Sequence, residues 1–250
     1  MDNRLTDVLA EQPYPLCFVT VSGAHLYGFP SSDSDYDLRG AHVLPAQEVL
    51  GLDVGRETIE DSRERDGMEV DLVTHDVKKF FSLLLRRNGY ALEQLYSPLV
   101  AHTTHEHQEL KVIAKGCITR HHWHHYAAFA ASEWKLFAKE DRRRTKRLLY
   151  LYRVLLAGIH LMRTGEVEAN LVHLNEGFRL PYLADLIARK MAGSEEMALD
   201  DTDALFHERE YHRLAAIMEE AATSSSLPDK PSTKPALNDL LVRLRMQSVR

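Results

Sequence analysis

Cysteine is scarce in this chain, and the two cysteines present suggest neither a metal site nor a disulfide framework. Cys17 and Cys117 lie far apart in otherwise unremarkable segments. Their spacing matches neither a paired metal-ligand motif nor the regular cysteine pattern of a small disulfide-rich fold. We therefore expect two buried, free thiols.

Long apolar runs are also absent. No stretch approaches the roughly 18 apolar residues that a membrane span requires. The first residues, Met1-Asp2-Asn3-Arg4, are polar and lack the apolar core of a signal peptide. We therefore expect a cytoplasmic protein with no membrane partner.

The chain has no excess of positive charge. It carries 31 Lys and Arg against 37 Asp and Glu, a formal net charge of −6 at pH 7. This balance argues against general affinity for nucleic acid, although it allows a local basic strip. The apolar fraction of 44% and charged fraction of 27% are those of an ordinary globular protein.

The pattern of the 250 residues changes near residue 100. Short β-type runs dominate before it, and helical periodicity dominates after it. We predict an α+β fold with two domains. Residues 1–100 form a catalytic domain, a mixed β-sheet with flanking helices, and residues 101–250 form an all-helical domain.

The individual elements follow from alternation, periodicity and turn residues. Strands are predicted at 16–21, 36–43, 58–61 and 68–74, the last two as a hairpin across the polar turn 63–67. Helices are predicted at 4–10, 76–87, 106–117, 122–139, 145–163, 181–192, 202–222 and 236–245. Asp76 is expected to cap the second helix. A strap with three prolines and a serine run, residues 223–235, precedes the last helix.

The most informative motif joins residues 22–28, a small glycine-containing turn, to residues 34–40, a strand that carries Asp35 and Asp37. Side chains at i and i+2 of a strand emerge on the same face. Two carboxylates so close repel each other unless a cation lies between them. Oxygen ligands of this kind suit Mg²⁺ or Mn²⁺. The pair alone is more often a solvated strand end, but the turn beside it favours a metal-and-phosphate site.

A third carboxylate is available on the strand predicted at 68–74. If this strand lies beside the one carrying Asp37, either Asp71 or Glu69 can complete the cluster, and we prefer Asp71. Two metals about 3.5–4 Å apart would then share Asp35 and Asp37. One would clamp a nucleoside triphosphate (NTP). The other would activate a hydroxyl, with Asp71 as its ligand and candidate general base.

The turn supplies the candidate phosphate contacts Ser22, Gly23, Ala24 and Ser34, through backbone N–H groups and hydroxyls. Basic residues extend this set, each with a structural alternative. Arg39 is expected either to touch substrate phosphate or to form an ion pair that holds Asp37. In the basic run 142–147, Lys146 shares a helix face with Arg153, and the pair is a candidate for holding triphosphate or an RNA backbone. The flanking arginines are expected to be solvated surface charge.

A histidine-rich segment, residues 121–125, raises a zinc hypothesis, because His121 and His125 lie at i and i+4 of a helix. No matching cysteine or HExxH pattern accompanies them. A polar helix start is therefore the preferred interpretation.

The segment 23–40 resembles the signature of the DNA polymerase β-type nucleotidyltransferase superfamily: a Gly-Ser turn, a helix, then Ser-Asp-x-Asp on a strand. Residues 22–28 and 34–40 are more closely similar to the YcgL-like, RNA-ligase-associated predicted nucleotidyltransferases (RlaP). Further segments with this resemblance are Lys79-Phe80, Asn88, 92–95, 152–158 and 226–228. The resemblance implies an NTP-using, Mg²⁺-dependent enzyme of the polymerase-β type, and for some relatives a setting in RNA repair.

One departure from the superfamily pattern weakens the phosphate turn. The usual Gly-Ser pair is Gly23-Ala24 here, which removes a hydroxyl worth about 0.5–1.5 kcal/mol as a neutral hydrogen-bond donor. Backbone contacts survive, and Ser22 can substitute. The sequence thus predicts a Mg²⁺- or Mn²⁺-dependent nucleotidyltransferase that moves a nucleoside monophosphate from an NTP to a hydroxyl, with an RNA or tRNA end as the first choice of acceptor. Two alternatives remain: transfer to a protein or small molecule, and a non-catalytic nucleotide-binding module.

Overall fold

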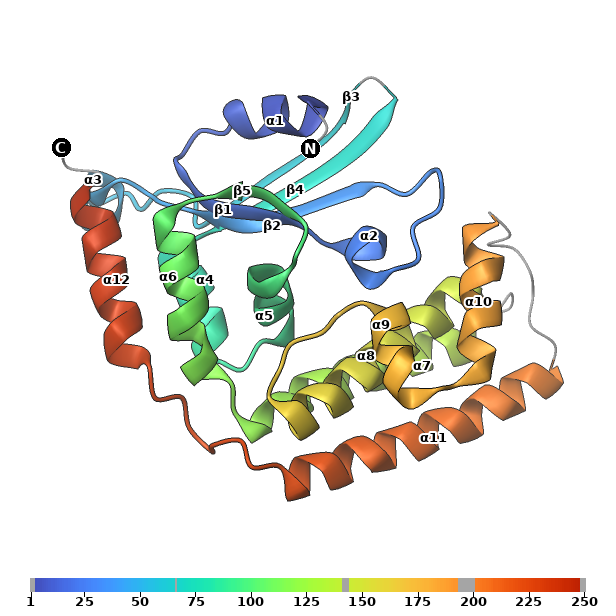
Figure 1. Ribbon diagram of the computed structural model, residues 1–250. Coiled ribbons are helices and arrows are strands. Elements are labelled where there is room, and N and C mark those ends of the chain that lie inside the picture. Colours follow the sequence, from blue (N-terminus) through green and yellow to red (C-terminus); the bar gives the residue numbers. More distant parts are fainter. Residues whose placement is uncertain (1–2, 66, 141–143, 193–200, 248–250) are drawn as a thin grey trace. The chain divides into compact units, whose positions relative to one another are not determined.

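The computed structural model describes residues 3–65, 67–140, 144–192 and 201–247 (Figure 1). The chain forms two compact units, each assembled from separate segments. The first comprises Met1–Leu26, Asp35–Ile118 and Lys230–Arg250. The second comprises Tyr27–Ser34 and Thr119–Asp229. Segments of the two units therefore alternate along the sequence. The domain boundary expected at residue 100 stays a prediction.

The first unit is built on a five-stranded mixed sheet. The strands are β1 (Leu16–Val21), β2 (Tyr36–His42), β3 (Thr58–Arg65), β4 (Met68–Asp76) and β5 (Val100–Thr103), in the order β3-β4-β2-β1-β5. The β2–β4 pair is parallel and the other pairs are antiparallel. The α+β prediction is confirmed, and so is the expected β3–β4 hairpin.

Helices cover both faces of this sheet (Figure 1). Leu5 and Val8 of α1 (Asn3–Ala10) pack in one apolar cluster with Leu38 of β2 and with residues of β1, β4 and β5. On the other face, Phe18 of β1 makes an edge contact with Phe80 of α4 (Val77–Leu85) at 5.1 Å between ring centroids. Because strand side chains alternate, the neighbours of Leu38 emerge on this second face. That alternation places Asp37 and Arg39 away from the α1 core.

Asp76 organises the end of β4 and the last helix of the chain. Its side chain caps α4 by accepting from the backbone N–H of Lys78, as predicted. It also forms an ion pair with Arg245 of α12 (Lys234–Gln247). Arg245 Nη2 donates to Asp76 Oδ1 at 2.6 Å and to Asp76 Oδ2 at 2.7 Å. Only 2% of the Asp76 side chain is exposed, so Asp76 and Arg245 form a buried ion pair. The pair joins α12 to the end of β4 within the first unit.

The second unit is helical and centres on α8 (Thr145–Thr164). This helix contacts α7 (Trp123–Lys139), α9 (Leu171–Phe178), α10 (Pro181–Met191) and α11 (Asp201–Ser224). Most of its side chains are buried, which is typical of a central helix surrounded by others. The segment 27–34 packs on it through the rings of Tyr27 and Phe29, which contact Tyr150.

Several elements of the described residues were not predicted from the local sequence pattern. They include the short helices α2 (Gly23–Tyr27), α3 (Ala46–Leu50), α5 (Gly89–Tyr96) and α9. The expectation that residues 101–250 are all helical was wrong at its start, because β5 spans Val100–Thr103. This four-residue strand forms by pairing with β1, and so short a run carries no readable alternation. Residues 142–143 of the basic run lie outside the described residues.

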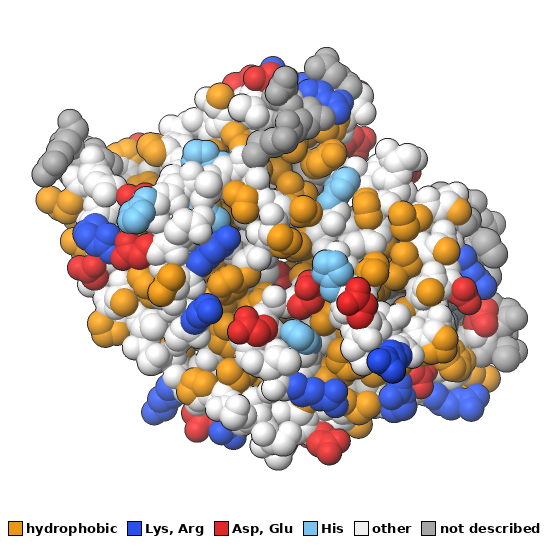
Figure 2. Space-filling model, in the orientation of Figure 1, with side chains coloured by type: hydrophobic (Ala, Val, Ile, Leu, Met, Phe, Trp, Pro, Cys, Tyr) orange, Lys and Arg blue, Asp and Glu red, His pale blue; other side chains and the backbone are white. Residues whose placement is uncertain are grey.

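Two expectations about composition can be compared with the structure. Cys17 and Cys117 are buried free thiols, as predicted. Among the helices of the described residues, none has the length and apolar character to cross a membrane. On the face shown in Figure 2, Lys and Arg side chains are interspersed with acidic and apolar ones, which fits the modest net charge of −6.

Candidate functional site

The pairing of β2 with β4 brings two of the predicted carboxylates together. In this parallel pair Asp37 lies directly opposite Asp71. Both side chains are half-buried, with 30% and 38% of their surface exposed. Asp35 lies just before β2 and is exposed. Glu69 is exposed and pairs in register with Glu64 of β3, so Asp71 is the direct neighbour of Asp37.

Arg39 bridges the two facing carboxylates. Its Nη2 donates to Asp37 Oδ1 at 2.7 Å and to Asp71 Oδ2 at 2.8 Å. Its Nη1 donates to the backbone carbonyls of Leu38 and Asp71, at 2.9 and 2.6 Å. The structure therefore shows the ion pair that was one of the two alternatives for Arg39. Contact with a substrate phosphate stays a prediction.

The two carboxyl groups have opposite pKa shifts. Burial raises the pKa of Asp37, and repulsion from Asp71 and Asp35 adds to this, against the lowering effect of Arg39. Burial also acts to raise the pKa of Asp71, but the hydrogen bond from Ser62 and the partnership with Arg39 outweigh it, so that pKa is lowered. Ser62 Oγ donates to Asp71 Oδ1 at 2.6 Å. At Asp37 the effect of burial outweighs that of the Arg39 ion pair, and at Asp71 the hydrogen-bond partners outweigh burial.

The predicted phosphate turn lies against Asp37. The backbone N–H of Ser22 donates to the carbonyl oxygen of Asp37 at 2.7 Å. Gly23 has φ +60°, and a Cβ placed there would come within 1.8 Å of Asp37 Oδ2. Only glycine fits this close approach, because any side chain would strike the carboxylate and strain the backbone. Asp37 thus lies between the guanidinium of Arg39 and the turn, with half-buried Ala24 next in the chain.

The donor chemistry of the cluster fits a hard divalent cation, although Arg39 already provides positive charge there. Within the part of the chain that the structure describes, no three His, Cys, Asp or Glu side chains converge closely enough to hold a metal ion. The Arg39 guanidinium bonds one carboxylate oxygen of Asp37 and one of Asp71. The side chains of the cluster offer only oxygen ligands, which are the ligands that Mg²⁺ and Mn²⁺ prefer.

The other three predicted nucleotide-binding residues belong to the second unit. Ser34 Oγ accepts from the backbone N–H of Ser31 at 2.9 Å. Lys146 is exposed near the start of α8. Arg153 is fully buried, with its guanidinium carbon 4.0 Å from the centre of the Tyr27 ring. It packs the 27–34 segment onto α8, so Lys146 and Arg153 differ in exposure. The predicted phosphate contact of Arg153 stays a prediction.

Sequence reasoning missed the partners that hold the cluster in place. Ser62 on β3 lies opposite Asp71 and was not singled out. Its signal was the hairpin itself, because cross-strand neighbours of a candidate residue are fixed once the register is known. Thr58 on β3 and His75 on β4 were also not singled out: Lys79 Nζ and His75 Nδ1 both hydrogen-bond Thr58 Oγ1.

The histidine-rich segment forms no metal site among the described residues. His121 Nε2 lies 3.5 Å from Asp229 Oδ1. The His121 ring stacks on the His124 ring, with the ring centroids 6.0 Å apart. His122 is buried and forms a capping box with Thr119. The preferred interpretation of a polar helix start fits this arrangement.

Comparison with known proteins extends the resemblance to nearly the whole chain. The family model described as "RlaP: RNA repair pathway DNA polymerase beta family" matches residues 1–243. The uncharacterized protein MJ0002 of Methanocaldococcus jannaschii is 28% identical over 238 residues, covering 93% of this chain and 96% of the relative. The uncharacterized protein YcgL of Bacillus subtilis is 28% identical over 255 residues, covering 97% and 95%. The chain therefore belongs to the RlaP family, the RNA repair pathway DNA polymerase beta family.

Proposed function

We propose that this protein transfers a nucleoside monophosphate from an NTP to a hydroxyl acceptor and releases pyrophosphate. One observation carries the proposal. Asp37 and Asp71 face each other across β2 and β4, and the Gly23 turn closes directly over the Asp37 carboxylate. A carboxylate pair therefore lies beside a tight glycine-containing turn, and this arrangement supports a metal-and-phosphate site. Membership of the polymerase beta family supports the same reaction class.

Asp35, Asp37 and Asp71 are the proposed ligands of Mg²⁺ or Mn²⁺, as is typical of polymerase beta-type nucleotidyltransferases. A divalent cation bound there would neutralise phosphate charge and lower the pKa of the attacking hydroxyl. The side chains and backbone of the site would orient the triphosphate and the attacking hydroxyl. Ser22, Gly23 and Ala24 offer the triphosphate a tight turn, and Asp71 is the proposed base because it lies directly opposite Asp37 on the neighbouring strand.

Arg39 is proposed as a positioning residue. Its guanidinium spans both facing carboxylates and two backbone carbonyls, so it holds β2 and β4 in register at the site. Like-charged carboxylates on adjacent strands would otherwise repel each other and separate. Because the ion pairs are half-exposed, a divalent cation can compete for the carboxylate oxygens at modest cost.

The first proposed acceptor is an RNA end, a tRNA-like end in particular, because the family description places its members in RNA repair. Transfer to a protein or small molecule uses the same chemistry and is an alternative outcome of the test. A non-catalytic nucleotide-binding module is favoured by one feature, Ala24 in place of the usual serine. The carboxylate pair favours catalysis.

The test is incubation with Mn²⁺ and each α-³²P-labelled NTP, with and without tRNA. Label on RNA supports the first acceptor, and label on the protein itself or on a small molecule supports the second. Nucleotide binding with no transfer in any arm contradicts the catalytic proposal. Asp71→Asn is expected to abolish transfer. Glu69→Gln is the matched control, because Glu69 is an exposed carboxylate two residues away on the same strand.

A further inference from the structure

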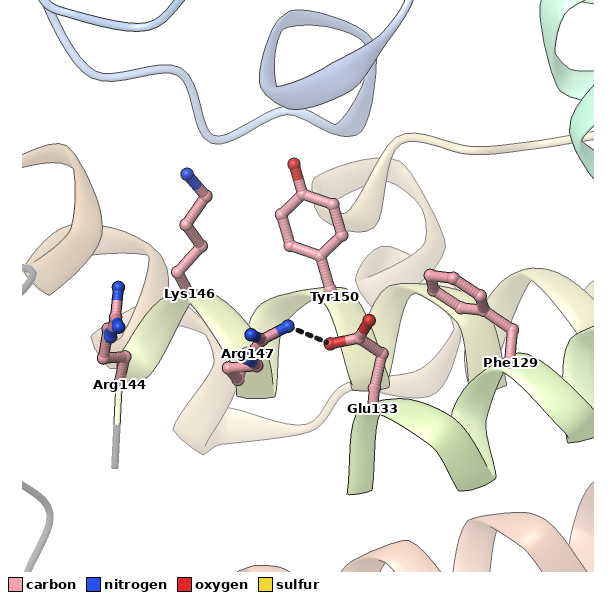
Figure 3. A pocket seen from close by; sticks show the side chains of 6 residues that line it. All are labelled: Phe129, Glu133, Arg144, Lys146, Arg147 and Tyr150. Carbon is pink, nitrogen blue, oxygen red and sulfur yellow. Dashed lines mark hydrogen bonds and ion pairs between the residues drawn. The ribbon is translucent and has the colours of Figure 1, made fainter. Parts of the chain in front are cut away.

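The second unit contains a pocket of about 360 Å³ between α7 and the start of α8 (Figure 3). The residues that line it are Phe129, Glu133, Arg144, Lys146, Arg147 and Tyr150. Its volume is in the range of small-molecule sites in proteins, about 300–1,000 Å³. Three cations, one carboxylate and two aromatic rings are an unusual lining for an ordinary packing defect, which is apolar.

The lining comes from two helical rows. Phe129 and Glu133 are four residues apart on α7, and Lys146 and Tyr150 are four residues apart on α8, so each pair shares one helix face. Figure 3 shows Lys146 and Tyr150 extending to the same side of α8, with the Arg147 side chain directed toward Glu133. The pocket is therefore lined by side chains from both helices.

The charges have distinct roles. Arg147 is bound to Glu133 at 3.4 Å and to Glu140 at 2.9 Å, so its charge is largely balanced within the protein. Only 10% of the Glu133 side chain is exposed, which makes it a fixed acceptor in the wall. Arg144 and Lys146 are exposed and add positive charge. The pocket therefore combines a buried hydrogen-bond acceptor, Glu133, with the exposed cations Arg144 and Lys146.

The aromatic wall is preorganised. The Tyr150 ring makes edge contacts with Tyr27 at 5.6 Å and with Phe29 at 5.7 Å between centroids. These contacts fix the ring before any ligand arrives, so little side-chain entropy is lost on binding. Flat rings beside a cationic side are the combination that binds nucleotides, because bases stack on aromatic side chains and phosphates pair with Lys and Arg.

We infer that this pocket binds a phosphorylated nucleoside. The base lies against the rings of Tyr150 and Phe129. Glu133 accepts hydrogen bonds from amino or hydroxyl groups of the nucleoside, and Lys146 with Arg144 contacts phosphate. The bound nucleotide can be either a free NTP or the terminal nucleotide of an RNA, because both present a base, a ribose and phosphate. The inference rests on the proposed function only for the use to which the bound nucleotide is put.

The test is isothermal titration calorimetry on the full-length protein in EDTA, where the carboxylate cluster has no divalent cation with which to hold a triphosphate. The probes are ATP and a short 5′-phosphorylated single-stranded oligoribonucleotide. Lys146→Gln is expected to weaken binding about tenfold, the scale of one charge-assisted hydrogen bond. Lys135→Gln, an exposed lysine of α7 outside the pocket, is the charge-matched control and is expected to bind like the unmodified protein.

Comparing the two probes distinguishes a free NTP from an RNA end as the ligand of the pocket. A loss confined to ATP assigns the pocket to the donor, and a loss confined to the oligonucleotide assigns it to the acceptor end. Absence of binding by the unmodified protein, or equal affinities for Lys146→Gln and Lys135→Gln, overturns the inference. Asp37→Asn separates it from the proposed function, because that variant is expected to lose transfer and keep binding in EDTA. Retained pocket binding in a protein that transfers no label would contradict the proposed function alone.

Discussion

Replacing Arg39 with glutamine tests how the carboxylate cluster is held together. The substitution removes two charge-assisted hydrogen bonds, to Asp37 at 2.7 Å and to Asp71 at 2.8 Å. A hydrogen bond to a charged group contributes about 1.5–3 kcal/mol when buried, and an exposed ion pair about 0–1 kcal/mol. The two Arg39 ion pairs are intermediate in burial, with 21–38% of each side chain exposed. About 1 kcal/mol for each, and about 2 kcal/mol together, is therefore expected.

The pH dependence of this loss has a definite sign. Asp71 has a lowered pKa, so it stabilises the folded state at neutral pH, and this contribution is lost as the pH falls through that pKa. Asp37 has a raised pKa, so it destabilises the folded state at neutral pH and is relieved as the pH falls. Without Arg39 both pKa values rise. The stability difference between Arg39→Gln and the unmodified protein is thus largest near pH 7 and shrinks toward about pH 4, the ordinary range of aspartate.

Thermal unfolding with and without Mg²⁺ measures these effects. For a chain of this length, about 2 kcal/mol corresponds to a fall in Tm of about 4–8 °C. Mg²⁺ is expected to raise the Tm of Arg39→Gln more than that of the unmodified protein, because the guanidinium no longer competes for the carboxylates. Arg65→Gln is the control, since Arg65 bridges Asp7 and Glu11 on the surface away from the cluster. An unchanged Tm in Arg39→Gln, or an equal response to Mg²⁺ in both proteins, would show that Arg39 does not hold the two carboxylates together.

Three further substitutions test the turn and the scaffold. Ala24→Ser restores the hydroxyl of the usual superfamily turn and is expected to tighten NTP binding about two- to tenfold by calorimetry with Mg²⁺ present; weaker binding would contradict this role of the turn. Gly23→Ala places a Cβ against Asp37 at φ +60°, so a lower Tm and loss of transfer are expected, and normal activity would rule out the close approach. Arg245→Ala leaves the buried Asp76 carboxylate without its ion pair and is expected to cost about 3–5 kcal/mol in denaturant unfolding; a cost below about 1 kcal/mol would show that this pair does not anchor α12.

The elements that the sequence predicted correctly are those with a strong local signal. Leu16–Val21 is a compact apolar run, and Asp76 is a standard capping residue before an apolar helical stripe. The pairing of Asp37 with Asp71 was predicted only conditionally, because alternation identifies strands but does not identify neighbours. The parallel register of β2 and β4 supplies what the pattern lacked.

The parts that were not predicted depend on contacts distant in sequence. The burial of Arg153 arises because the 27–34 segment packs Tyr27 over its guanidinium, and helix periodicity contains no information about that segment. The bridging role of Arg39 follows from the presence of Asp71 on the next strand. The pocket between α7 and α8 needs two helices side by side, so only Lys146 and the neighbouring basic run were visible beforehand.

We propose that Asp35, Asp37 and Asp71 bind a divalent cation beside the Gly23 turn. Anomalous X-ray diffraction from crystals grown with Mn²⁺ and a non-hydrolysable NTP analogue would locate that cation. We expect a Mn²⁺ peak about 2.0–2.3 Å from carboxylate oxygens of Asp37 and at least one of its partners, with triphosphate at the turn. Mn²⁺ and nucleotide bound elsewhere, with Arg39 still bridging Asp37 and Asp71, would contradict it.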